Sequence, residues 1–178
     1  MFRIFLSYLT FPGIIAHEFA HAWACRRLGI HVEQVCYLRI GNPLGYVRHE
    51  RPSSPFQQAM VVVAPFFLST FLAAALSFCA CLLSRTRFPP ETRGIGTLLA
   101  VWCSFSIALH AFPSSGDADS LWDELRCPDA GFAARTVLAP VVGMIRLARL
   151  GTRFWLDILF ALAVVALPPA LLLVLTGE

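Results

Sequence analysis

The chain has 178 residues, of which 57% are hydrophobic and only 14% are charged, whereas a soluble domain has about 25% charged residues. Too few polar side chains are present for a compact water-soluble domain, and the abundance of apolar residues excludes intrinsic disorder. The net charge of +3 arises from 14 arginines, no lysine and 11 acids, and the arginines are spread between apolar runs, which speaks against nucleic-acid binding.

Four apolar runs are long enough to cross a membrane, because about 20 helical residues span a hydrocarbon core of ~30 Å. They are Ile4 to Cys25, Phe56 to Leu83, Gly94 to Phe112 and Phe154 to Thr176. Arginines flank these runs, as snorkelling side chains do at the membrane surface. We therefore predict a mainly α-helical, polytopic membrane protein with four to five membrane helices, folded as one domain over residues 1–178.

Between the first two runs lies a polar segment with short apolar stretches on either side of Gly41-Asn42-Pro43-Leu44-Gly45. Two short strands around a turn rich in Gly, Asn and Pro are typical of a β-hairpin. We expect this hairpin, from Val32 to Val47, to lie outside the lipid or under a protein cover, since open sheet edges do not face hydrocarbon.

The segment 132–150 is compatible with two placements. It is apolar enough to span, yet a basic stripe on one helical face suits a helix that lies on an anionic leaflet. The stripe consists of Arg135, Arg146, Arg149 and Arg153. After it comes the last predicted span, 154–176, in which Asp157 is expected to pair with Arg153, four residues earlier.

The first apolar run contains His17-Glu18-Phe19-Ala20-His21, an H-E-x-x-H motif. On a helix, the two histidines project from one face with Cβ atoms about 5–6 Å apart, so that both imidazoles can bind one zinc ion, with Glu18 beside them as a general base. Burying such a cluster in a membrane helix costs on the order of 2.5–3.5 kcal/mol per charge, which makes a functional site the default interpretation.

A catalytic zinc usually has three protein ligands, so a third one is required. If the hairpin stays on the side where the first span ends, the third span returns to that side at Phe112. Asp117 and Asp119 follow Phe112 there, and Cys25 continues the face of His17 and His21. The crossing count makes the two aspartates candidates for the third ligand, and the helical spacing adds Cys25.

The residues from Pro12 to Ala22, followed by Arg27-Leu28-Gly29-Ile30 and a hairpin, resemble the start of the site-2 protease family of intramembrane zinc metalloproteases. The resemblance extends through Asp119, about two thirds of the chain. It implies a catalytic core within residues 1–127 with three spanning helices, zinc held by His17, His21 and Asp117, and Glu18 as the base. It also implies hydrolysis of peptide bonds in or near the transmembrane segments of membrane-protein substrates.

The chain departs from the family pattern before the aspartate, where the usual Asn-x-x-Pro appears as His110-Ala111-Phe112-Pro113. His110 either replaces that Asn as a group that binds the substrate or caps the end of the third span. Cys25 is the weaker ligand candidate because three successive side chains at i, i+4 spread over about 12 Å. Asp117 is preferred to Asp119 because it follows Gly116, whose flexible backbone can turn the carboxylate inward.

Two other functions are compatible with these residues. One is a catalytically silent, zinc-containing membrane protein that binds another protein's transmembrane helix, although a structural site does not need a base such as Glu18. The other is a metal transporter, which would need polar residues along the spans; these offer mainly Ser69, Thr70, Ser104 and Ser106.

The distribution of arginines gives the expected orientation. The loops on the side of the hairpin hold Arg26, Arg27, Arg39, Arg48, Arg51 and Arg126, and the opposite side holds Arg3, Arg85, Arg87 and Arg93. Arginine-rich loops stay in the cytoplasm. We expect a multi-pass protein of a prokaryotic cytoplasmic membrane, with the site nearer the cytoplasmic face and the lipid bilayer and membrane-protein substrates as its partners.

Overall fold

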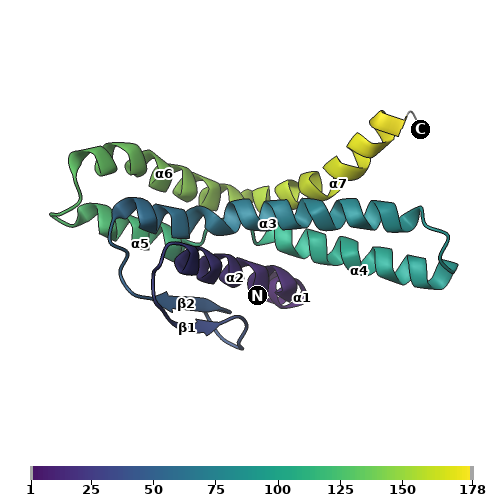
Figure 1. Cartoon of the computed structure of the whole chain (residues 1–178), viewed down its shortest axis with the longest axis horizontal. Coiled ribbons are helices and arrows are strands. Elements are labelled where there is room, and N and C mark those ends of the chain that lie inside the picture. The colour runs from purple at the N-terminus through teal and green to yellow at the C-terminus, as the bar shows by residue number, and fades with distance from the viewer. Residues whose placement is uncertain (1, 177–178) are drawn as a thin grey trace.

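The computed structural model describes residues 2–176, which form seven α-helices, a 3₁₀ turn and one two-stranded sheet (Figure 1). The chain is mainly helical, as predicted. The hairpin was predicted between the first two apolar runs and lies there, which in the structure is between the second and third helices, because the first run forms two helices. In order, the elements are α1 (Phe2–Leu9), α2 (Phe11–Arg27), β1 (Val32–Cys36), β2 (Tyr46–His49), α3 (Pro55–Ser84), α4 (Pro90–Leu109), α5 (Ser115–Arg126), α6 (Phe132–Gly151), η1 (Thr152–Phe154) and α7 (Leu156–Thr176).

Among the described residues, three helices are long and apolar enough to cross a membrane: α3, α4 and α7. They pack on one another, and Figure 1 shows α3 and α4 side by side. Ser104 of α4 donates a hydrogen bond to the Ala73 carbonyl of α3 at 2.7 Å, and Ser77 of α3 donates one to the Val165 carbonyl of α7 at 2.6 Å. The chain therefore has the architecture of a multi-pass integral membrane protein.

The first apolar run forms two helices, α1 and α2, and not the single span predicted over Ile4 to Cys25. Pro12 explains the break, because it has no N–H to offer the carbonyl four residues earlier and its ring collides with that carbonyl. A new helix begins after Thr10, whose backbone is not helical (φ −107°, ψ 35°). With 17 residues, α2 is shorter than the about 20 that a full crossing requires.

Gly13 brings α2 unusually close to α4. A Cβ at this position would lie 1.9 Å from the Ser106 carbonyl oxygen, so no side chain larger than hydrogen fits. α2 also contacts α3 and carries the buried Ala20, Ala22 and Ala24. The helix with the H-E-x-x-H motif is therefore packed tightly against two of the membrane helices.

The hairpin is antiparallel, with Val32 opposite His49 and Cys36 opposite Tyr46, and its register shifts between Val32 and Gln34. The prediction of a hairpin from Val32 to Val47 is thereby confirmed, although β2 extends to His49. The hairpin lies beside α2 (Figure 1).

At the Pro55 end of α3, α5 and α6 lie side by side (Figure 1). Their apolar faces form a buried cluster with α3: Ala59, Val62, Ala118, Leu121, Leu125, Ala134, Leu138, Val142 and Ile145. In the basic stripe of α6, Arg135 donates to the carbonyls of Leu125 and Cys127, and Arg146 pairs with Asp119 at 3.2 Å. These two arginines therefore contact α5 and the turn that follows it, and not the anionic leaflet that the interfacial placement of 132–150 would have given them.

Asp157 pairs with Arg3 of α1, which corrects the expected pair with Arg153. Arg153 lies in η1, and Trp155 after it adopts a left-handed backbone (φ 64°). Because the helix is interrupted between them, Arg153 and Asp157 are not one turn apart on a common face. The pair that does form links the N-terminal helix to the last span.

Candidate metal centre

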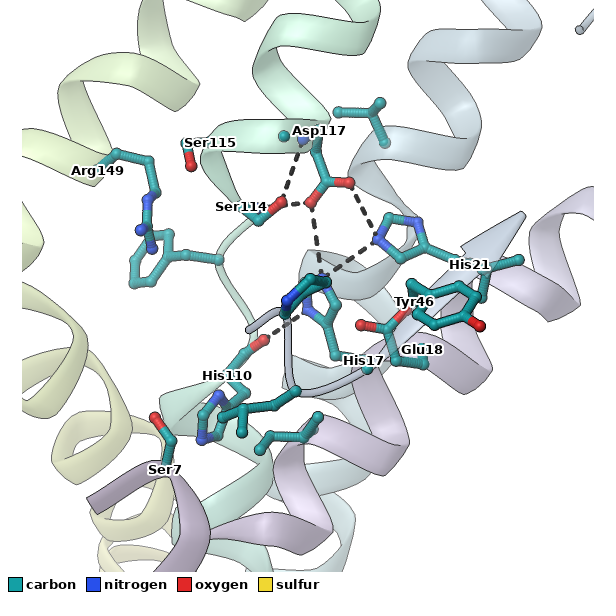
Figure 2. Close-up of a pocket in the computed structure, with 18 of the residues that line it drawn as sticks. Ser7, His17, Glu18, His21, Tyr46, His110, Ser114, Ser115, Asp117 and Arg149 are labelled. Carbon is teal, nitrogen blue, oxygen red and sulfur yellow. Dashed lines mark hydrogen bonds and ion pairs between the residues drawn. The ribbon is translucent and has the colours of Figure 1, made fainter. Parts of the chain in front are cut away.

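Three side chains from two helices converge beneath the hairpin (Figure 2). His17 and His21 project from α2, and Asp117 projects toward them from α5. The two Nε2 atoms are 3.2 Å apart. Asp117 Oδ1 lies 3.3 Å from His21 Nε2, and Oδ2 lies 3.7 Å from His17 Nε2. Asp117 therefore meets two histidines that lie 96 and 100 positions earlier in the sequence.

These distances fit a zinc ion. Bonds of about 2.0–2.1 Å in a tetrahedral arrangement place neighbouring ligand atoms about 3.3 Å apart, which is close to the separation of the two Nε2 atoms and to that of His21 Nε2 and Asp117 Oδ1. All three residues are sheltered from solvent, and their ligand atoms lie within 4.8 Å of one another. The group can hold a metal ion, and imidazole nitrogens and carboxylate oxygens are both ligand types that zinc accepts.

Each histidine is oriented by a backbone carbonyl. His17 Nδ1–H donates to the His110 carbonyl at 2.8 Å, and His21 Nδ1–H donates to the Val61 carbonyl at 2.9 Å. Because Nδ1 holds the proton of each neutral imidazole, both Nε2 lone pairs face the shared point, as required for metal binding. The Nε2 lone pairs of His17 and His21 then face each other at 3.2 Å beside the Asp117 carboxylate. A cation bound between these three groups would be stabilised by all of them.

Both carbonyls are free for a structural reason. His110 caps the C-terminus of α4, where carbonyls have no helical partner. Val61 lies inside α3, and its carbonyl would normally accept the N–H of residue 65, but Pro65 has none. Sequence reasoning did not predict that Val61 and Pro65 orient His21. The available signal was a proline in the middle of a long apolar helix, which leaves the carbonyl four residues earlier unpaired.

Asp117 is held by a capping box at the start of α5. Ser114 Oγ accepts the Asp117 N–H at 3.1 Å, and Asp117 Oδ2 accepts the Ser114 N–H at 2.6 Å. Burial raises the pKa of Asp117, but in the absence of a metal ion hydrogen bonds from the protonated imidazoles of His17 and His21, and the positive charge of those rings, outweigh this and hold the pKa well below its usual range. The carboxylate is therefore fixed and ionised, the form that binds metals.

The other two candidates for the third ligand lie elsewhere. Asp119 is exposed and faces Arg146. Cys25 is buried in an apolar cluster with Ala24, Ile30 and Val61. The structure brings Asp117 to the histidines, whereas the assignment of zinc-ligand roles stays a prediction.

Glu18 lies beside the two histidines at the wall of a cavity of about 740 Å³ that the three candidate ligands also line. The loop between β1 and β2 passes directly over it, since a Cβ on Gly45 would lie 2.7 Å from Glu18 Cγ. Figure 2 shows the Tyr46 side chain next to Glu18. Glu18 is half-buried, so the loop shelters its carboxylate while the cavity leaves one side open.

His110 also lines the cavity, but its imidazole points toward α1 and away from the three candidate ligands (Figure 2). Its Nε2 lies 2.9 Å from Thr10 Oγ1, which donates its own proton to the Leu6 carbonyl at 2.8 Å. Burial lowers the pKa of His110 to about 4, with a smaller contribution from His17, so the ring is neutral. The residue caps α4, and a role in substrate binding stays a prediction.

Comparisons of the chain with protein-family models, with curated proteins and with solved structures found no match.

Proposed function

We propose that this chain is a zinc metalloprotease that hydrolyses peptide bonds in or near the transmembrane segments of membrane proteins. The observation that supports this most is the convergence of His17, His21 and Asp117 at ligand distances, with Glu18 beside them at the wall of an open cavity. A membrane architecture around such a centre favours substrates that are themselves in the membrane.

In this mechanism, His17, His21 and Asp117 would hold the zinc. Bound zinc would lower the pKa of a water molecule toward ~7 and polarise the scissile carbonyl. The Glu18 carboxylate would accept a proton from the attacking water and deliver it to the amide nitrogen of the leaving group, since one group serves as base and then as acid. The carbonyls of Val61 and His110 keep the imidazoles in the required tautomer throughout.

The hairpin supplies a means of presenting a peptide to this centre. In the described residues the sheet has two strands, so each keeps one unpaired edge. A substrate segment that has left its helical conformation can pair with such an edge through backbone hydrogen bonds, which exposes its peptide bonds. Tyr46 and Val47 of β2 line the cavity and bring that strand to the centre.

The polar groups of the spans do not favour metal transport. Thr70, Ser104 and Ser106 each donate to a backbone carbonyl, at 2.6, 2.7 and 2.7 Å. Thr70 and Ser106 bond within their own helices, and Ser104 bonds α4 to α3, so these three hydroxyls are already occupied. Ser69 is buried without a hydrogen-bond partner in the described residues, and a single free hydroxyl does not make a polar path for a metal ion.

The test compares wild type with Glu18→Gln in proteoliposomes that contain a panel of fluorophore-labelled single-span peptides. We expect wild type to cleave a member of the panel and Glu18→Gln to cleave none, while metal analysis finds equal zinc in both. Cleavage at equal rates would overturn the proposal. Zinc in both proteins with cleavage by neither, in the presence of helix binding, would support the silent alternative.

A further inference from the structure

A second cavity, of about 410 Å³, lies on the outer side of α2 and α3 and shares no residue with the cavity of the metal centre. We name it the α2–α3 groove. Its lining includes Trp23, Met60, Ala64, Phe67 and Phe71, and Arg27 is its one charged side chain. Phe67 and Phe71 are 66% and 72% exposed. The groove is therefore open and apolar, and its one positive charge is the guanidinium of Arg27.

The position of the groove along α3 corresponds to one leaflet. From Met60 to Phe71 the helix rises about 16 Å at about 1.5 Å per residue, and half of the hydrocarbon core is about 15 Å. α3 runs from Pro55 to Ser84, so Phe71 lies near its middle and Met60 near its first turns. The groove thus extends from the membrane surface to the bilayer centre.

The charge lies at the surface end. Arg27 belongs to the last turn of α2, next to the exposed Arg26, and its guanidinium lies 5.5 Å from the centre of the Trp23 ring. Among the salt bridges of the described residues, none involves Arg27. Stacking on an indole orients the guanidinium and leaves its N–H donors available for an oxyanion.

We infer that the α2–α3 groove binds one anionic phospholipid, with an acyl chain along Met60, Ala64, Phe67 and Phe71 and the headgroup phosphate at Arg27. The leaflet depth fits an acyl chain, and a guanidinium at the mouth complements a phosphate. This inference does not depend on the proposed protease activity.

Native mass spectrometry of the full chain, released from nanodiscs with equal phosphatidylglycerol and phosphatidylcholine, tests the inference. We expect one retained phospholipid per chain, with phosphatidylglycerol preferred about fivefold, since one arginine near an anionic headgroup is worth about 1 kcal/mol. Arg27→Gln should abolish the preference. The matched control is Arg126→Gln, because Arg126 also stacks on an indole, Trp122, at 5.1 Å, outside the groove, and this variant should keep the preference.

A second variant tests the apolar part. Ala64→Leu fills the groove and should lower the retention of both lipids, with helical content checked by circular dichroism. The inference is overturned if wild type retains both lipids equally, if Arg27→Gln behaves like Arg126→Gln, or if the groove is occupied by a second copy, seen as a dimer without lipid.

Discussion

Replacing Pro65 by alanine separates the stability of α3 from the affinity of the metal centre. The substitution supplies an N–H that can pair with the Val61 carbonyl inside the helix. That carbonyl now accepts the Nδ1 proton of His21 at 2.9 Å. The helical bond competes with the His21 bond, and the imidazole loses the partner that fixes its tautomer and orientation.

The two effects have opposite signs. A proline inside a helix costs up to about 3 kcal/mol relative to alanine, so we expect Pro65→Ala to unfold at an equal or higher temperature. Outer hydrogen bonds to metal ligands are typically worth 10–100-fold in affinity. We expect about tenfold weaker zinc binding, or about 1.4 kcal/mol, which matches the net value of one neutral hydrogen bond, about 0.5–1.5 kcal/mol.

The assay is a zinc titration against a chromophoric chelator in detergent, with thermal unfolding of the zinc-free protein measured in parallel. Pro140→Ala is the matched control, because Pro140 also lies inside a helix, α6, but outside the cavity of the centre. It should leave the zinc affinity unchanged. Wild-type affinity in Pro65→Ala would refute the reasoning, as would an equal loss in Pro140→Ala.

Three further outcomes are expected. Asp117→Asn should lose zinc in metal analysis, whereas Asp119→Asn should weaken binding by less than about tenfold; the reverse result would assign the ligand to Asp119. Gly45→Ala should reduce peptide cleavage but retain zinc, because its Cβ would lie 2.7 Å from Glu18 Cγ and 3.0 Å from the Tyr37 carbonyl oxygen; unchanged cleavage would exclude a tight cover. Cysteines placed at Asn42 and Arg87, in a background without native thiols, should be labelled from opposite sides of the membrane, and labelling from one side would contradict the crossing count.

Helical spacing was sufficient to predict that His17 and His21 share a face, because that geometry is local. The convergence of Asp117 was also expected, but for a different reason. The predicted cause was a flexible backbone at Gly116, whereas a capping box fixes the carboxylate through Ser114. The pattern Ser-x-x-Asp before an apolar residue was readable from the sequence and typical of a helix start.

Other features depend on long-range packing that no local pattern contains. The pair of Arg3 and Asp157 joins residues 154 positions apart, and Trp155 interrupts the helix between Asp157 and its expected partner Arg153. The break between α1 and α2 is an intermediate case. Pro12 was a signal for the break between the two helices, but the run is apolar throughout, and its length alone predicted a single span.

The length of α3 has a consequence for where a peptide would be cut. Its 30 residues measure about 45 Å, at about 1.5 Å per residue, and exceed a hydrocarbon core of ~30 Å by about 15 Å. If the excess is shared between both ends, the core boundary falls about five residues after Pro55, and Val61, which holds His21, lies just inside it. Cleavage would then occur within the first turns of a target's membrane helix, where water is near, and hydrolysis products should map to the ends of its apolar segment.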